Sequence, residues 1–131
     1  MVEFSIQTGG STDFVDATAQ VQAAAEELGI EEGAVLVYVP HTTAAVTINE
    51  GADPAVVRDI DMELDKIVPL QDGYRHAEGN SAAHIKSSLF GCSELVVVSG
   101  GRLVLGTWQK IWFCEFDGPR RRRIVVQKLS A

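Results

Sequence analysis

The 131-residue chain is poor in cysteine and contains no long apolar run. Its two cysteines, Cys92 and Cys114, are too few and too far apart for a disulfide framework or a paired-cysteine zinc site, so we expect a reducing, cytoplasmic location. No stretch approaches the roughly 18 consecutive apolar residues of a membrane span. The first residues also lack the basic start and apolar stretch of an export signal. We therefore expect no interaction with a membrane.

Positive charge is also scarce, because 11 lysines and arginines stand against 18 aspartates and glutamates and give a net charge of −7. Binding to nucleic acid depends on summed positive charge, so a nucleic-acid partner is not expected. The local exception is the run from Arg120 to Arg123. Because no aromatic residues are interleaved with it, we interpret this run as a solvated segment beside a strand.

Hydrophobic residues (46%) and charged residues (22%) occur in proportions typical of globular proteins, and we expect a single domain over residues 1–131. Alternating or β-branched apolar residues predict strands at 2–7, 34–39, 44–50, 95–99, 102–105, 107–116 and 123–129. Helical spacing predicts helices that start at Asp16, Asp53 and Asn80 or Ser81, and that stop at Gly29, Pro69 and Gly91. This order predicts an α+β fold with a mostly antiparallel sheet, in which the last strands form a meander.

The chain has only three histidines, and each one stands at the boundary of a predicted element. His41 follows a strand, His76 lies in a long loop, and His84 lies in the first turns of a helix. Neutral imidazole is the commonest protein ligand of zinc, and three protein ligands leave a fourth position open for water or substrate. The pattern leaves two interpretations open: one shared metal site, or three separate hydrogen-bonding residues.

Carboxylates and hydrogen-bond donors accompany these histidines. Glu50, Asp53 and Glu78 are candidates to accept the second ring N–H of a ligating histidine, although capping a helix is the better interpretation of Asp53. The donors near the histidines are Thr42, Thr43, Asn80, Ser81 and Lys86. With the unpaired N–H groups at the start of the helix, they predict a phosphate site. The alternatives are capping for Asn80 and Ser81, and a solvated side chain for Lys86.

Trp108 and Gln109 are further candidates for substrate binding. A tryptophan ring can stack on a heteroaromatic ligand, whereas a tryptophan in a strand normally belongs to the core. Cys114 alternates with apolar neighbours and is interpreted as a small buried hydrophobic residue.

Several ordered motifs together resemble the YjbQ-like family over nearly the whole chain. They are His41-Thr42-Thr43 with the residues up to Glu50, Asp53-Pro54, Tyr74-Arg75-His76, Ala82 to Leu89, Gly101-Arg102-Leu103 and Leu105 to Ile111. The resemblance implies a two-layer α+β sandwich of mostly antiparallel or mixed β-sheet with two to three helices, assembled as a homotrimer. It also implies a shared site in which His41, His76 and His84 hold a divalent metal such as zinc, with sulfate or phosphate nearby.

The resemblance further implies an enzyme that acts on a phosphorylated small molecule. Family members are labelled secondary thiamine-phosphate synthases, which join a pyrimidine pyrophosphate to a thiazole phosphate. A metal ion and Lys86 could stabilise the pyrophosphate leaving group, and Trp108 could stack on a ring. The alternatives are a metal-dependent phosphoester hydrolase with Glu50 or Glu78 as general base, and a non-catalytic metal- or anion-binding trimeric module.

Overall fold

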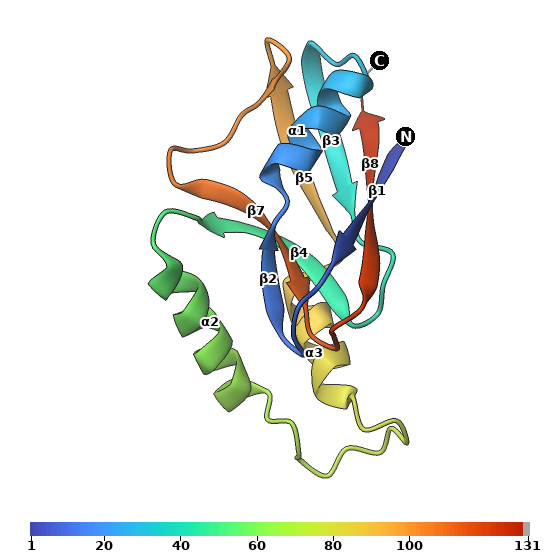
Figure 1. Ribbon diagram of the computed structural model, residues 1–131, viewed down its shortest axis with the longest axis vertical. Helices are drawn as coiled ribbons and strands as arrows, with labels where there is room; N and C mark the ends of the chain where they lie inside the picture. The colour runs from blue at the N-terminus through green and yellow to red at the C-terminus, as the bar shows by residue number, and fades with distance from the viewer. Residues whose placement is uncertain (130–131) are drawn as a thin grey trace.

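Over residues 1–129, the computed structural model contains eight strands and three helices (Figure 1). The strands are β1 (Val2–Gln7), β2 (Asp13–Asp16), β3 (Glu32–Tyr38), β4 (Ala44–Glu50), β5 (Ser93–Ser99), β6 (Arg102–Leu103), β7 (Gln109–Glu115) and β8 (Arg121–Leu129). The helices are α1 (Thr18–Glu27), α2 (Pro54–Ile67) and α3 (Ser81–Phe90). The predicted α+β class and all three predicted helices are confirmed.

The strands form two antiparallel sheets, a five-stranded one in the order β1-β8-β3-β5-β6 and a three-stranded one in the order β2-β7-β4. The predicted C-terminal meander is therefore wrong beyond β6. After the β5–β6 hairpin the chain enters the three-stranded sheet as β7, then returns as β8 between β1 and β3. Strand β2 was not predicted, because two of its four residues are aspartates and its apolar pattern is too short to recognise.

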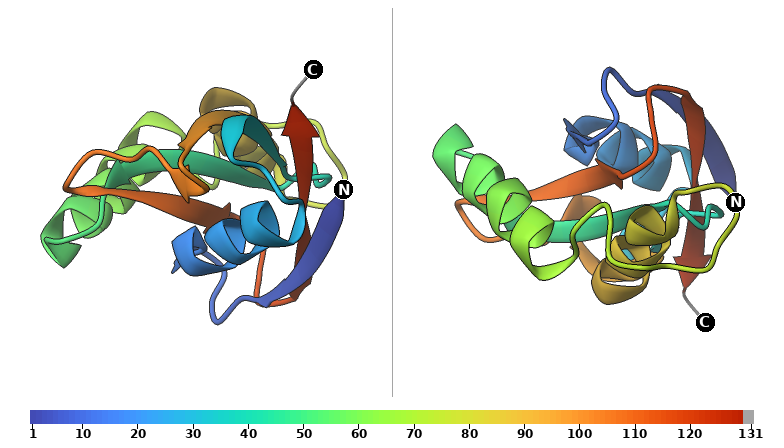
Figure 2. Two further views of the ribbon diagram at one scale, coloured as in Figure 1. Left: turned by 90° about the horizontal axis from the view of Figure 1, so that it is seen from above. Right: turned by 90° about the horizontal axis from the view of Figure 1, so that it is seen from below.

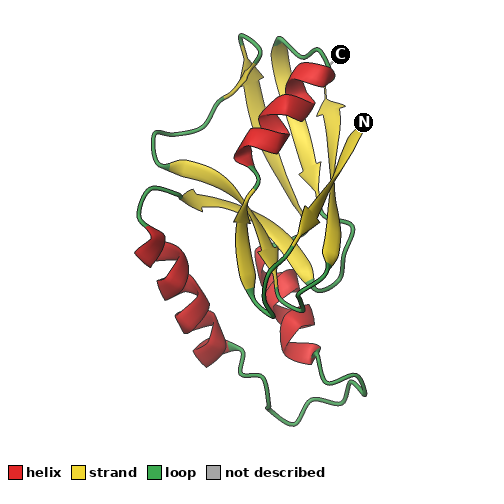
Figure 3. Ribbon diagram, viewed as in Figure 1, coloured by secondary structure: helices red, strands yellow, loops and turns green. Residues whose placement is uncertain are grey.

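The main core lies between α1 and the two sheets. Helix α1 crosses one face of the five-stranded sheet (Figure 3), and Val21, Ala24 and Ala25 are buried there, as the helical spacing predicts. The predicted cap is wrong, because Asp16 is the last residue of β2 and Ala17 occupies the N-cap position before Thr18. The Asp16 carboxylate nevertheless accepts the backbone N–H of Thr18 at 3.0 Å, which satisfies one free donor of the first turn.

Helices α2 and α3 pack on the face of the three-stranded sheet that points away from α1 (Figure 2). The N-cap predicted for α2 is confirmed, because the Asp53 side chain accepts the N–H of Ala55 at 2.9 Å and Pro54 opens the helix. Cys114 is fully buried in this second core, as predicted. None of the helices within residues 1–129 has the length and apolar character needed to cross a membrane.

The outer face of the five-stranded sheet carries exposed apolar side chains. Leu95 and Val97 of β5 are 60% and 56% exposed, and Tyr38 of β3 and Leu129 of β8 point to the same side. The buried Val35 and Val37 alternate with them and face α1. We call this side of the sheet, on which the four exposed apolar side chains lie, the open sheet face.

Candidate functional site

The three histidines line one pocket of about 440 Å³. It lies where the β3–β4 connection, the loop before α3, the first turn of α3 and the β7–β8 connection meet. The rings of His76 and His84 stand edge to face, with their centroids 5.3 Å apart. Histidines separated by up to 43 positions are thus brought together at one end of the molecule. We call this site the histidine pocket.

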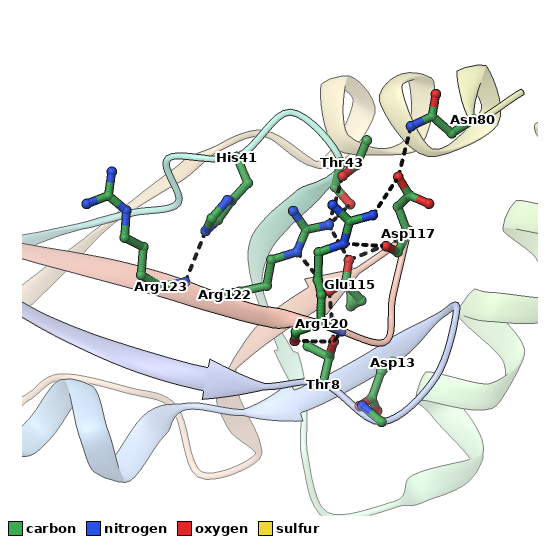
Figure 4. A network of polar contacts seen from close by, with 11 residues as sticks. Thr8, Asp13, His41, Thr43, Asn80, Glu115, Asp117, Arg120, Arg122 and Arg123 are labelled. Atoms are coloured by element: carbon green, nitrogen blue, oxygen red, sulfur yellow. Dashed lines mark hydrogen bonds and ion pairs between the residues drawn. The ribbon is translucent and has the colours of Figure 1, made fainter. Parts of the chain in front are cut away.

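His41 has a defined hydrogen bond within this pocket. Its Nε2 accepts the backbone N–H of Arg123 at 3.0 Å (Figure 4). Burial, followed by the positive charge of Arg122, lowers the pKa of His41 below its ordinary value. The imidazole is therefore neutral at pH 7, and with Nε2 as acceptor its Nδ1 carries the hydrogen. A metal ion could be bound by His41 only if the ring gave up the bond to Arg123.

His76 is accompanied by a carboxylate. Glu78 Oε2 lies 3.9 Å from His76 Nε2, and both side chains are exposed at the mouth of the pocket. A carboxylate in this position can orient an imidazole or accept a proton from a bound molecule. Of the two glutamates proposed from the sequence, Glu78 is therefore the one that reaches the histidines.

Thr42, Thr43 and Asn80 also line the histidine pocket. The Thr43 hydroxyl accepts a hydrogen bond from Nη2 of Arg122 at 2.8 Å. The Asn80 side chain makes no capping bond to α3, so that alternative is wrong; its Nδ2 donates instead to Asp117 Oδ2 at 2.8 Å. This contact ties the start of α3 to the β7–β8 connection.

Lys86 lies outside the histidine pocket. It lines a neighbouring pocket of about 510 Å³ that shares Asn80 and Asp117 with the first. The residue is only 6% exposed, and its Nζ lies 2.6 Å from Asp65 Oδ1 of α2. The interpretation of Lys86 as a solvated lysine is therefore wrong, because its position on α3 turns it towards α2 and Phe116 rather than towards water.

Glu50, Trp108 and Gln109 lie at the opposite end of the three-stranded sheet. Strand β4 separates Glu50 from the histidine pocket by roughly 20 Å, since a strand rises about 3.3 Å per residue. Glu50 accepts the N–H of Ala52 at 2.7 Å, and Gln109 accepts that of Gly106 at 2.7 Å, so both side chains hold local turns. Trp108 is 63% exposed in a turn, so it is not a core residue of a strand.

Two arginines that the sequence interpretation set aside, Arg120 and Arg122, also line the histidine pocket. The run from Arg120 to Arg123 is not uniformly solvated, because Arg122 is only 5% exposed and pairs with the fully buried Glu115. Strand alternation could have revealed this. Arg122 shares the inward face of β8 with Ile124 and Val126, whereas Arg121 bonds to Ser5 on the other face.

Glu115 is the centre of a buried polar network (Figure 4). Its Oε1 accepts from the Thr8 hydroxyl and from Nε of Arg122, both at 2.8 Å, and its Oε2 accepts from Nη2 of Arg122 and from the N–H of Asp117. Burial alone would raise the pKa of Glu115, but the hydrogen bonds from Arg122, the Asp117 N–H and Thr8 outweigh it and lower the pKa. The pair is therefore a charged carboxylate and a charged guanidinium.

Metal-ligand geometry is not preformed in the described part of the chain. Among residues 1–129, no three His, Cys, Asp or Glu side chains already stand in an arrangement that would hold an ion. The donors nevertheless suit zinc, because two imidazoles face each other at 5.3 Å and a third, neutral imidazole lines the same pocket. His76 and His84 could bind together with small side-chain movements, and His41 could join after releasing Arg123.

The architecture defines a small α+β protein with two antiparallel sheets and a pocket of histidines and arginines at one end. The family model described as UPF0047 protein YjbQ-like matches residues 2–131, and the chain belongs to this family. It is 50% identical to the UPF0047 protein YugU of Bacillus subtilis over 126 residues, which cover 95% of this chain and 96% of the relative.

Solved structures support the same assignment. An uncharacterised conserved protein of the YjbQ/UPF0047 family from Clostridium acetobutylicum superposes with a TM-score of 0.96 at 49% identity, covering 98% of this chain and all of the other (100%). A hypothetical protein from Aeropyrum pernix K1 superposes with a TM-score of 0.93 at 36% identity, covering 99% of this chain and 98% of the other.

Proposed function

We propose that this protein is an enzyme that acts on a phosphorylated small molecule with the help of a zinc ion bound by His41, His76 and His84. The observation that carries the proposal is that all three histidines of the chain line one pocket together with Arg120 and Arg122. Imidazoles are zinc ligands, and guanidinium groups are preferred partners of phosphate oxygens.

The residues of the pocket have distinct roles in this proposal. When bound, zinc would supply Lewis-acid polarisation of a phosphoryl oxygen. Arg120 and Arg122 bind the phosphate oxygens, and the Thr42 hydroxyl offers a further hydrogen bond. Glu78, beside His76, accepts the proton of the attacking nucleophile.

Hydrolysis of a phosphoester is the reaction that these residues support best. Hydrolysis requires a general base, hydrogen-bond donors to the phosphate oxygens and metal ligands, and all of these groups line the histidine pocket. A thiamine-phosphate-synthase-type transfer is the second candidate, since the adjoining pocket with Lys86 at its wall offers room for a second substrate. Trp108 gives no support to that transfer, because it lies at the other end of the sheet.

We also propose that the chain works as a cytoplasmic homotrimer. The apolar side chains of the open sheet face, among them Leu95 and Val97, would be covered by neighbouring copies. Both cysteines are free, which suits a reducing compartment.

Metal analysis of the purified protein beside single alanine variants of the three histidines tests the zinc site. We expect one zinc per chain in the unsubstituted protein and loss of most of it in the His76→Ala and His84→Ala variants. Full zinc content in all three variants would contradict the proposed site.

Activity is tested with a panel of phosphomonoesters and, separately, with the two thiamine precursors, each with and without a chelator. Glu78→Gln is expected to lower turnover by about 100-fold or more, in the range of a lost general base. Glu50→Gln is the matched control, since this glutamate lies at the far end of β4 and should leave turnover unchanged. Zinc binding without turnover of any substrate would favour the non-catalytic alternative.

A further inference from the structure

Arg122 has a guanidinium group that is held on one side and free on the other. Its Nε and Nη2 donate to the two carboxylate oxygens of Glu115, and Nη2 also donates to the Thr43 hydroxyl at 2.8 Å. Nη1 has no hydrogen-bond partner within residues 1–129, and Arg122 lines the histidine pocket. The donors left for a bound molecule are therefore those of Nη1.

Glu115 cannot contact a substrate itself, because the residue is fully buried in β7. Its carboxylate is saturated by four donors: Nε and Nη2 of Arg122, the Thr8 hydroxyl and the N–H of Asp117. Thr8 follows β1 and Asp117 follows β7, so groups from separate strands fix the carboxylate. A carboxylate held in this way can fix the plane of the guanidinium group that it binds.

Arg120 provides a contrast within the same pocket. Its side chain is 51% exposed, and its contacts are to Asp117, through the backbone carbonyl at 2.8 Å and the carboxylate at 3.3 Å. Arg120 can therefore adjust to a ligand, whereas the buried Arg122 offers donors in one direction only.

We infer that Glu115, supported by Thr8, is a positioning residue that fixes Arg122 so that its Nη1 faces the phosphate of the substrate. The inference rests on the proposed function for the identity of that anion. Its consequence is that phosphate affinity depends on the orientation of the guanidinium group as well as on its charge.

Glu115→Gln separates orientation from charge, because the two predict opposite changes. If charge alone mattered, removing the negative charge next to Arg122 would tighten anion binding. If Glu115 positions Arg122, the glutamine NH₂ faces a guanidinium donor, and the two-point hydrogen-bonded pair with Nε and Nη2 is lost. Phosphate then binds about tenfold more weakly. The expected result for Glu115→Gln is weaker phosphate binding by the metal-free protein, while the zinc content of the variant as purified is unchanged.

The test is calorimetric titration of metal-free protein with inorganic phosphate. The variants are Glu115→Gln and Arg122→Lys. Arg122→Lys keeps the positive charge but cannot form the two-point hydrogen-bonded pair with Glu115. Arg121→Lys, on the opposite face of β8, is the matched control. We expect both variants to bind more weakly and the control to bind as the unsubstituted protein does. Unchanged or tighter binding by folded Glu115→Gln would overturn the inference.

If circular dichroism shows that Glu115→Gln does not fold, Thr8→Val takes its place. This variant removes one of the four hydrogen bonds to the carboxylate from outside the pocket, so a two- to threefold loss of phosphate affinity is expected, and no loss would overturn the inference. Binding of phosphate without binding of zinc would contradict the zinc site and leave the role of Glu115 intact. Binding of zinc without phosphate would do the reverse.

Discussion

Replacement of Arg122 by alanine is expected to destabilise the protein by about 3 kcal/mol at pH 7, since removing one partner of a buried ion pair typically costs about 3–5 kcal/mol. The substitution leaves the fully buried Glu115 carboxylate without the donors Nε and Nη2. Thr8 and the N–H of Asp117 still donate to that carboxylate, which places the loss at the lower end of the range. Urea unfolding followed by circular dichroism measures the difference.

Arg121→Ala is the control for this experiment. The Arg121 side chain is exposed on the other face of β8, and within residues 1–129 its hydrogen bonds go only to the Ser5 hydroxyl. A loss below about 0.5 kcal/mol is therefore expected. If Arg122→Ala lowers the free energy of unfolding no more than Arg121→Ala does, the view that the buried Glu115 carboxylate needs Arg122 as its partner is refuted.

The deficit of Arg122→Ala is also expected to depend on pH. In the unsubstituted protein the pKa of Glu115 lies below its ordinary value of 4.5, so its stabilising contribution is present above that pH and is lost as the pH falls through the lowered pKa. Without Arg122, burial dominates and the pKa of Glu115 rises, so the variant relieves its buried charge by taking up a proton. The difference between the two proteins should therefore shrink from pH 7 towards 4.5, and a constant difference would contradict the mechanism.

Three further predictions concern other parts of the molecule. In the native protein only the Cys92 thiol should react with a thiol reagent, and after denaturation both thiols should react. Cys92 is exposed, whereas Cys114 is fully buried and burial raises the pKa of its thiol. Equal reactivity of the two thiols in the native protein would contradict this. Asp65→Ala should lower stability by about 1–2 kcal/mol in thermal unfolding, because the buried Lys86 ammonium loses its carboxylate partner, and adding Lys86→Met should restore part of the loss; no recovery in the double variant would count against the ion pair. Leu95→Asp on the open sheet face should dissociate the proposed trimer in light scattering, and an unchanged mass would exclude this face as the interface.

Local signals were sufficient to predict most of the elements. The Asp53-Pro54 pair with its apolar spacing identified α2, because capping and helical periodicity are properties of neighbouring residues. The same holds for β4, whose predicted range agrees with the structure. Strand partners depend on distant segments, and so the transfer of β7 to the second sheet and the short β2 were missed.

The residues of the candidate site also divide into those that the sequence predicted and those that it placed wrongly. Scarcity drew attention to the three histidines, and their positions at element boundaries suggested that they could meet, as the shared pocket shows. Glu50 and Lys86 lie near these histidines along the chain, and Trp108 has a ring suited to stacking, but neither property places a side chain in the pocket. The length of β4 carries Glu50 to the end of the sheet where Trp108 also lies, and the position of Lys86 on α3 turns it towards the neighbouring pocket.

The residue types, the helix boundaries and the alternation of strands were determined by the sequence alone, because these properties depend on covalent neighbours. Which side chains meet was decided only by the tertiary structure, through the return of β8 between β1 and β3. That return buries Arg122 against Glu115 at the wall of the histidine pocket. A run of arginines that resembles a solvated surface therefore contains one of the most buried charges of the protein, because strand pairing sets its face and a distant carboxylate compensates its charge.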